Sequence, residues 1–252
     1  MRVLIIDNHD SFVHNITGLL QSIRNHDDRF RGLRWDIALN DEADPETALL
    51  YDALILSPGP GLPCEAGRLM ETVKACAGSV PMLGICLGFQ AIAETFGASL
   101  RQLPSPRHGH PSRLTCIDEK DPLAGSLAGT SPVVGRYHSW IVDKDTLPPE
   151  LTATSFDEEG NVMSLRHLTL PVFGTQFHPE SVITDCGRRL LAADAESRLK
   201  LGGQRRPDKP HQFLFRRDRH SLPLQRETNG VQDAGGRIGQ RPVQVKKNGI
   251  VH

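Results

Sequence analysis

The sequence predicts an α/β fold: a doubly wound, mostly parallel open sheet with helices on both faces and a small antiparallel addition at one edge. Residues 3–6, 53–56 and 81–85 are short, nearly continuous apolar runs, as expected of strands that are covered on both faces. The intervals between these runs are long enough for the crossover helices that parallel strands require. Residues 113–170 instead alternate polar and apolar side chains over short stretches, and this pattern favours antiparallel strands.

The individual segments support this fold in chain order. The first apolar run, at residues 3–6, precedes residues 15–23, whose apolar side chains recur at helical spacing and form one stripe. The runs at residues 53–56 and 81–85 predict two further strands, and the second of them continues directly into an amphipathic helix. A fourth run, VFGT at residues 172–175, predicts another short strand.

The composition is that of an ordinary globular protein. The chain has 252 residues, of which 38% are hydrophobic and 23% charged, and this composition excludes a fibrous, largely disordered or membrane-embedded chain. Residues 1–195 carry 16 Lys and Arg against 25 Asp and Glu, whereas residues 196–252 carry 13 against 5. We therefore expect one domain at residues 1–195, followed by a basic C-terminal extension at residues 196–252.

Three interpretations of the C-terminal extension are open. From about residue 202, Gly, Pro, Arg, Gln and His dominate and the apolar residues lose their periodicity, which favours a disordered basic segment. The stretch FLFRR at residues 213–217 is one weak indication of a nucleic-acid-binding tail. The third interpretation is the product of a shifted reading frame. The first is favoured, and no nucleic-acid partner is expected.

The apolar runs and the cysteines bear on location and on metals. The opening run, MRVLIID at residues 1–7, is too short for the apolar region of a signal peptide with its flanks, and no other run approaches the roughly 18 apolar residues of a membrane span. We therefore expect a cytoplasmic protein without a membrane partner. The five cysteines form an odd set with no CxxC pair, which argues against a disulfide framework and a zinc site. No metal is expected in the chain.

The most informative stretch is PMLGICLGFQAIAETF at residues 81–96. Gly84 and Gly88 bracket Cys86 in a G-x-nucleophile-x-G pattern, which is typical of a sharp strand-to-helix turn that lifts the nucleophile above the sheet. The positive end of the following helix favours the thiolate, and the backbone N–H of Leu87 points to where an oxyanion would develop. A small buried cysteine without chemistry is the competing interpretation. That interpretation is the one expected for the other cysteines, Cys64, Cys76, Cys116 and Cys186.

A nucleophilic cysteine needs a base, and His178 is the strongest candidate among the 11 histidines. It lies in VFGTQFHPES at residues 172–181, and Glu180 follows two residues later. Because positions i and i+2 of an extended chain project to the same side, Glu180 can reach the imidazole and hold its tautomer. Pro179 favours this extended form. Cys86 would thereby gain a base and an orienting carboxylate; a loop histidine without a catalytic role is the alternative.

The segment SPGPG at residues 57–61 follows the strand predicted at residues 53–56. It therefore lies at the carboxyl edge of the sheet, where open α/β sheets bind ligands. Glycine lets a backbone N–H approach a ligand without a Cβ in the way, so Gly59 is a candidate for the second oxyanion donor. A plain turn built from Pro and Gly is the competing account.

Taken together, these stretches resemble the class I, triad-type glutamine amidotransferases. The opening DNHDSFVHN at residues 7–15 narrows the resemblance to the glutaminase components of anthranilate synthase and aminodeoxychorismate synthase. The resemblance spans about residues 1–195, in family order. Its other motifs are SPGPG at 57–61, GICLGFQAI at 84–92, RYHSW at 136–140, MSLRH at 163–167 and QFHPESVIT at 176–184.

The resemblance implies a catalytic role for five of the residues singled out above. Cys86 would be the nucleophile, His178 the general base and acid, and Glu180 the partner that orients the imidazole. Gly59 and Leu87 would supply the two oxyanion N–H groups.

The resemblance also implies how glutamine is held. Gln90 would contact the bound glutamine, and Ser139 with Trp140 would present backbone groups to its amino-acid end. His138, in the same motif, is expected to be a loop histidine. Four residues of the opening motif are assigned to architecture near the site and to a partner-facing surface, with a strand-to-helix cap as the alternative. They are Asp10, Ser11, Phe12 and Asn15.

The family that this chain resembles hydrolyses glutamine through a cysteinyl thioester and passes the ammonia to a separate synthase subunit. The implied partners are therefore L-glutamine and a chorismate-binding synthase subunit, on which Mg²⁺ is expected; no cofactor is expected in this chain. Anthranilate, for tryptophan biosynthesis, is the favoured product, and 4-amino-4-deoxychorismate, for folate, is the alternative. Another elbow-type cysteine hydrolase and a non-catalytic regulatory subunit are the remaining alternatives.

Overall fold

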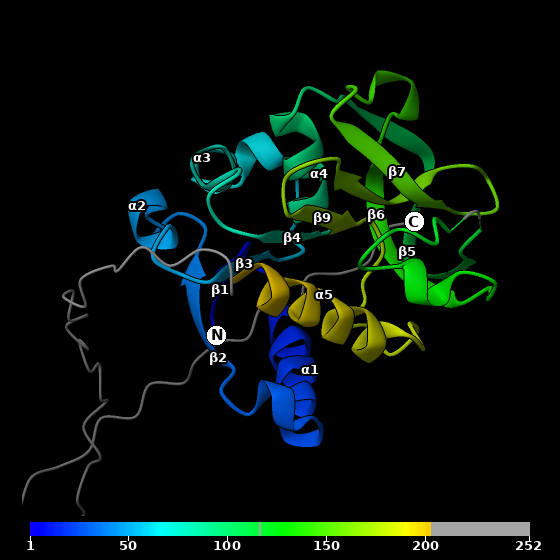
Figure 1. Ribbon diagram of the computed structural model, residues 1–252. Coiled ribbons are helices and arrows are strands. Elements are labelled where there is room, and N and C mark those ends of the chain that lie inside the picture. Colours follow the sequence, from blue (N-terminus) through cyan, green and yellow to red (C-terminus); the bar gives the residue numbers. More distant parts are fainter. Residues whose placement is uncertain (116, 203–252) are drawn as a thin grey trace, which may run out of the picture. The chain divides into compact units, whose positions relative to one another are not determined.

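A computed structural model describes residues 1–115 and 117–202 of the chain (Figure 1). A seven-stranded sheet forms its centre. The strands follow the order β2 (Arg34–Leu39), β1 (Arg2–Asp7), β3 (Ala53–Leu56), β4 (Met82–Ile85), β9 (Val172–Thr175), β8 (Val162–His167) and β7 (Leu151–Phe156). The first five are parallel to one another, whereas β8 pairs antiparallel with β9 and β7 pairs antiparallel with β8. The mostly parallel sheet with an antiparallel edge addition is confirmed.

Helices cover both faces of this sheet. The α-helices of the described residues are α1 (Val13–His26), α2 (Pro45–Ala48), α3 (Leu69–Cys76), α4 (Leu87–Thr95) and α5 (Gly187–Gly202). Short 3₁₀ helices occur at η1 (Asp28–Phe30), η2 (Pro63–Glu65), η3 (Gly125–Leu127) and η4 (Lys144–Thr146). Figure 1 shows α1 and α5 side by side, and the two helices are in contact. The helix expected at residues 15–23 is α1, which is longer at both ends.

Alternate residues of the inner parallel strands β1, β3, β4 and β9 belong to the cores on the two faces of the sheet. Val3 and Ile5 of β1 belong to the apolar core that contains residues of α1 and α5, whereas Leu4 and Ile6 belong to the core that contains residues of α3 and α4. This division follows because successive side chains of a strand point to opposite faces. The continuous apolar runs of the sequence therefore reflect burial on both faces, and the doubly wound arrangement is confirmed.

The antiparallel part of the chain forms two structures rather than one. β7 and β8 extend the main sheet beside β9, as expected, but β5 (Leu100–Arg113) and β6 (Val133–Val142) form a separate two-stranded sheet. A bridge between Gly135 of β6 and His178 connects this small sheet to the segment that follows β9. It thereby brings β6 to the carboxyl edge of the parallel strands.

The last described helix crosses the expected domain boundary. Residue 195 lies within α5, which continues to Gly202. Residues 203–252, most of the expected basic extension, lie outside the described residues, so the division of the chain at residue 195 stays a prediction. Among the helices of residues 1–115 and 117–202, none combines the length and the apolar character that crossing a bilayer requires.

Candidate active site

The turn between β4 and α4 holds Cys86 in a strained backbone conformation. Its φ is 51° and its ψ is −100°, a combination that residues other than glycine rarely adopt. Both flanking glycines are required by packing. A Cβ at Gly84 would lie 2.4 Å from the carbonyl oxygen of Gly88, and one at Gly88 would lie 2.3 Å from that of Leu56. The nucleophile elbow that the GxCxG spacing predicts is therefore present.

His178 and Glu180 lie in the segment after β9 and meet through a short hydrogen bond. Nδ1 of His178 is 2.7 Å from Oε1 of Glu180, and both side chains are buried. The backbone of His178 is fixed as well, since its N–H donates to the carbonyl oxygen of Gly135 at 3.0 Å and its carbonyl oxygen accepts from Oγ1 of Thr184 at 2.6 Å. With Nδ1 committed to the carboxylate, Nε2 is the ring nitrogen left for a nucleophile.

The side chain of His178 interacts with Cys86 at the turn between β4 and α4. Burial disfavours the imidazolium form of His178, but the neighbouring Cys86 and Glu180 outweigh burial and raise the pKa of His178 well above its ordinary value. Among the described residues, Nε2 of His178 has no partner that meets the geometric criteria of a hydrogen bond. Its interaction with the sulfur of Cys86 is therefore not a formed hydrogen bond. Catalytic contacts of this kind often tighten only when substrate binds. The structure thus brings together the three residues expected to form a triad.

Two aromatic rings flank the imidazole of His178. The ring centroids of Phe12, just before α1, and Tyr137, on β6, each lie 4.9 Å from that of His178, at interplanar angles of 65° and 61°. Such edge-on contacts limit rotation of the imidazole and preserve its orientation toward Glu180. Asp10 forms the turn that presents Phe12, because its Oδ1 accepts from the N–H of Phe12 at 2.8 Å. The opening motif therefore reaches the candidate base directly.

The SPGPG segment is fastened to the end of β1 and lies against the elbow. Asn8 donates to Ser57 twice, from its backbone N–H to Oγ at 2.9 Å and from its side chain to the carbonyl oxygen at 2.8 Å. A Cβ at Gly59 would lie 2.5 Å from Cβ of Asn8 and 2.7 Å from Cδ2 of Leu87, so only glycine fits there. Gly59 therefore lies beside Leu87, whose N–H opens α4 and has no partner within that helix.

Amide side chains connect the elbow to β6. Nε2 of Gln90 donates to the carbonyl oxygen of Trp140 at 2.8 Å and to Oε1 of Gln176 at 3.2 Å. Nε2 of Gln176 donates in turn to Sγ of Cys86 at 3.7 Å, within the range of a sulfur acceptor. Two residues expected to hold glutamine, Gln90 and Trp140, are therefore in contact, and Ser139 precedes Trp140 on the same strand.

Comparison with known proteins decides the family. Residues 4–196 match the family model for glutamine amidotransferase class-I. The chain belongs to this family. The match covers all of the residues that form the elbow, the His178–Glu180 pair and the amide network.

Two relatives of this amidotransferase chain are similar over most of their length. It is 39% identical to anthranilate synthase component 2 of Mycobacterium tuberculosis over 195 residues, which cover 76% of this chain and 80% of the relative. It is 40% identical to aminodeoxychorismate/anthranilate synthase component 2 of Bacillus subtilis over 192 residues, which cover 75% and 93%. The crystal structure of a glutamine amidotransferase from Thermotoga maritima matches with a TM-score of 0.60 at 18% identity, covering 79% of this chain and 98% of the other. This last likeness bears on the fold alone.

The expectation that His138 is a loop histidine is wrong. In the amidotransferase, His138 is a buried residue of β6, and its Nε2 accepts from Nε of Arg136 at 3.2 Å. Arg136 in turn forms a buried ion pair with Asp157 at 2.6 Å. Burial, the positive charge of Arg136 and the proximity of His178 lower the pKa of His138 to about 3. His138 is therefore a neutral ring whose Nε2 is an acceptor.

Gln176 is the member of the site that the sequence motifs did not single out. Its side chain is fully buried and contacts both Cys86 and Gln90. It precedes His178 by two positions, as His178 precedes Glu180. The i, i+2 rule for an extended segment would therefore have placed its side chain on the catalytic side as well.

The remaining described cysteines differ from Cys86 in their surroundings. Burial raises the pKa of Cys76 to about 11, and burial with the nearby Asp185 raises that of Cys186 to about 11. Both thiols are thus held in the protonated form, as the interpretation of inert cysteines requires. Cys64 is exposed, and Cys116 lies outside the described residues.

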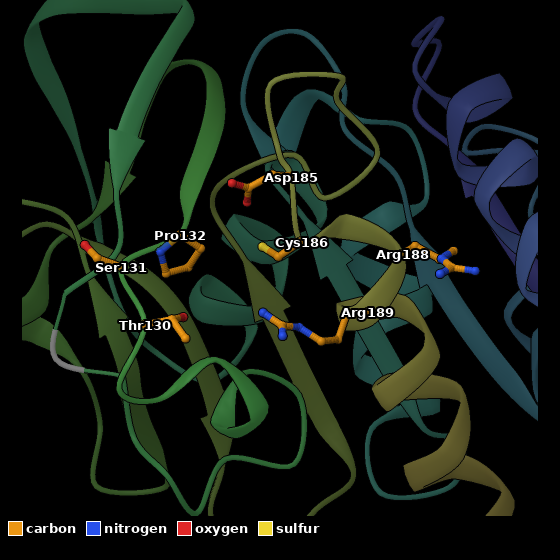
Figure 2. A pocket seen from close by; sticks show the side chains of 7 residues that line it. All are labelled: Thr130, Ser131, Pro132, Asp185, Cys186, Arg188 and Arg189. Atoms are coloured by element: carbon orange, nitrogen blue, oxygen red, sulfur yellow. The ribbon is translucent and has the colours of Figure 1, made fainter.

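A surface cavity of about 620 Å³ lies apart from the triad, at the start of α5 (Figure 2). It is lined by Asp185, Cys186, Arg188 and Arg189 on the α5 side and by residues 130–132 opposite. The triad residues do not line it. Within residues 1–115 and 117–202, no group of three or more His, Cys, Asp or Glu side chains is arranged to hold a metal ion.

Proposed function

We propose that this chain is the glutaminase subunit of a chorismate-using synthase. It hydrolyses L-glutamine to glutamate and supplies ammonia for the synthesis of anthranilate, in tryptophan biosynthesis. The observation that carries the proposal is the elbow, where Cys86 lies beside the buried pair of His178 and Glu180. The name of the Mycobacterium tuberculosis relative, anthranilate synthase component 2, supports the choice of acceptor. A cytoplasmic location belongs to the same proposal.

The first half of the reaction forms a thioester. The sulfur of Cys86 attacks the side-chain amide carbon of glutamine, and the carbonyl electrons move onto the oxygen as the C–S bond forms. The N–H groups of Leu87 and Gly59 stabilise the resulting oxyanion. His178 then passes its proton to the amide nitrogen, the C–N bond breaks, and neutral ammonia leaves. Glu180 holds the imidazole and stabilises its protonated form.

The second half of the reaction releases glutamate. His178, now neutral, takes a proton from a water molecule as that water attacks the thioester carbon. The C–S bond breaks, glutamate leaves, and the sulfur of Cys86 again faces a protonated imidazole. The raised pKa of His178 suits this cycle because it favours the protonated imidazole that donates to the departing nitrogen.

The amide network supports the expected contacts to the amino-acid end of glutamine. Both N–H bonds of Gln90 are committed, one to Trp140 and one to Gln176. Its Oε1 is therefore the atom that accepts from the α-ammonium group of the substrate. Ser139 and Trp140 present backbone groups to the same end, since they follow each other on β6.

Ammonia must reach a second active site before it is protonated, because ammonium has no free electron pair with which to attack. The acceptor site belongs to a separate synthase subunit that binds chorismate with Mg²⁺. In this proposal the partner covers the carboxyl edge of the sheet, where Cys86 lies, so that the ammonia remains shielded from water.

A second acceptor has a specific observation in its favour. The Bacillus subtilis relative carries both names, aminodeoxychorismate and anthranilate synthase component 2. The same glutaminase chemistry can therefore serve 4-amino-4-deoxychorismate, on the way to folate, through a different synthase subunit.

Co-purification of the partner synthase from the source cells tests the function and separates the acceptors. With glutamine, chorismate and Mg²⁺, the complex is expected to release glutamate and anthranilate in equal amounts, and Cys86→Ala is expected to abolish both. Formation of 4-amino-4-deoxychorismate instead would select the second acceptor. Glutamine left unchanged in the complete mixture, or cleavage of casein by the chain alone, would overturn the proposal in favour of a regulatory subunit or a peptidase.

A further inference from the structure

Gln176 is a buried polar side chain to which the proposed reaction gives no task. Its side chain is fully buried, although a primary amide loses much of its hydration on burial and needs compensating hydrogen bonds. Its two contacts lie at the start of one helix, since Gln90 is on α4 and Cys86 caps that helix. Neither partner is a neighbour of Gln176 in sequence, so these contacts hold the segment after β9 against the elbow.

The orientation of the Gln176 amide follows from the backbone carbonyl of Trp140, through Gln90. The carbonyl oxygen of Trp140 can only accept, so the amide of Gln90 must turn its nitrogen toward it, at 2.8 Å. The same nitrogen carries the second hydrogen, which points to Gln176 at 3.2 Å. Gln176 must therefore present its oxygen to Gln90 and its nitrogen to the sulfur of Cys86. A flip of either amide would place like groups against each other.

We propose that Gln176 is a positioning residue for the nucleophile. Its amide N–H donates to Sγ of Cys86, and Gln90 keeps the amide in that orientation through its own bond to the β6 carbonyl of Trp140. The inference rests on the proposed function, because it assigns a task within the same site. These hydrogen bonds connect β6, which receives the amino-acid end of glutamine, with the sulfur of Cys86, which attacks the side chain of glutamine.

A donor in this place favours the thiolate over the thiol. A hydrogen bond to a charged acceptor is stronger than one to a neutral acceptor, so the N–H of Gln176 stabilises the anion more than the protonated sulfur. The other groups that act on the sulfur are the imidazole of His178, with Glu180 behind it, and the positive end of α4. On the β6 side, His138 interacts with His178 and is neutral. Gln176 adds an uncharged donor to this set.

The test measures the thiolate directly, without glutamine. Cys86 is alkylated with iodoacetamide between pH 5 and pH 9 in a Cys64→Ser background, which removes the exposed thiol, and the modified peptide is quantified by mass spectrometry. Gln176→Leu is expected to move the midpoint of the rate upward by about one pH unit, the equivalent of about 1.4 kcal/mol. Gln176→Met keeps the length of the side chain but has no N–H donor, and it is expected to shift the midpoint as far.

Two further variants test the orientation by Gln90 and the specificity of the effect. Gln90→Leu is expected to shift the midpoint in the same direction, and the double variant Gln90→Leu/Gln176→Leu is expected to match Gln176→Leu alone, since both act through one contact. Gln21→Leu, the same chemical change on α1, is the matched control and is expected to leave the midpoint unchanged. Melting temperatures of all variants identify any that fail to fold.

The outcomes separate this inference from the function on which it rests. A folded Gln176→Leu or Gln176→Met enzyme with the parental midpoint overturns the contact with sulfur. Shifts of Gln90→Leu and Gln176→Leu that add in the double variant overturn the orientation through Gln90. If the midpoint shifts as expected but the parent complex does not hydrolyse glutamine, the positioning of the sulfur stands and the proposed function fails.

Discussion

The segment after β9 and strand β6 each contribute one buried histidine to the site, and the pKa values of the two rings are shifted in opposite directions. Burial disfavours the charged form of both. His178 also meets Cys86 and the carboxylate of Glu180, and its pKa is raised. His138 meets the guanidinium of Arg136 instead, and its pKa is lowered to about 3. Burial acts alike on both rings, so the sign of the neighbouring charge decides the difference.

This difference assigns different tasks to the two regions. The His178 region can take up and release a proton during a reaction, because its ring is stabilised when protonated. The β6 region holds its histidine neutral and uses it as an acceptor inside a network that ends at Asp157. The two regions meet at Gly135, whose carbonyl oxygen accepts from the N–H of His178. Strand β6, with a histidine that stays neutral, therefore supports the neighbouring residue that carries the proton.

The largest effect is expected from removing the proton carrier. His178→Gln is expected to lower the glutaminase rate by about 10²- to 10⁴-fold, the usual contribution of a general acid and base. Glutamate release in the complex with the synthase subunit measures it. His14→Gln, at an exposed position of α1, is the matched control and is expected to retain the parental rate. A His178→Gln enzyme with most of its activity would remove the distinction between the two histidines.

The next effect concerns the stability of the β6 region. Asp157→Asn leaves the buried guanidinium of Arg136 without its anion, and breaking such a pair is expected to lower the free energy of unfolding by about 3 kcal/mol. Urea denaturation measures the change. Asp145→Asn, at an exposed position in η4, is the matched control. Equal stability of Asp157→Asn and the parent would show that the ion pair does not hold this region together.

A smaller effect is expected from neutralising the carboxylate that distinguishes His178. Glu180→Gln keeps an acceptor for Nδ1 but removes the charge, and is expected to lower kcat/KM by about tenfold to a hundredfold, the value of a charge-assisted hydrogen bond. Without the negative charge of Glu180 the pKa of His178 should fall, so the pH profile of kcat/KM should move toward lower pH. Glu46→Gln, exposed on α2, is the control. A pH profile that does not move would contradict the electrostatic role of Glu180.

Counted per pH unit, the smallest effect is an acid sensitivity that originates in His138. Because the pKa of His138 is lowered to about 3 in the folded protein, the unfolded chain binds the proton first as the pH falls below about 6.5. Stability should therefore decrease on acidification from pH 6.5 toward pH 3, by at most about 1.4 kcal/mol per pH unit from this group. Thermal melts from pH 7 to pH 4 are expected to show a flatter dependence in His138→Gln. Identical slopes in the variant and the parent would contradict the assignment.

The parallel core of the fold was predictable because its signals are local. The expected strands at residues 53–56 and 172–175 have the bounds of β3 and β9, since strands buried on both faces are continuous apolar runs. β2 carries no such signal. It lies at the edge of the sheet, where all of its residues are at least partly exposed, and its apolar and polar residues are mixed. The separation of β5 and β6 from the main sheet depends on long-range pairing that a periodic pattern does not encode.

The residues of the candidate site also differ in how far the sequence alone predicts their arrangement. The elbow around Cys86 and the pairing of His178 with Glu180 follow from spacings of two residues, and both are readable without a fold. The surroundings of His138 are not, because Arg136 reaches it from the same strand while Asp157 comes from a distant turn. Gln176 falls between these cases, since its spacing places it beside His178 but its partners come from the distant start of α4.

The most direct test of the account is to trap the intermediate that joins glutamine to the chain. The complex with its synthase subunit is mixed with glutamine and quenched in acid within one turnover, and the peptides are analysed by mass spectrometry. A glutamyl thioester is expected on Cys86, with none in Cys86→Ser and with slower formation in His178→Gln. Glutamate that accumulates with no adduct on Cys86, or with the adduct on another residue, would contradict the assignment of the nucleophile.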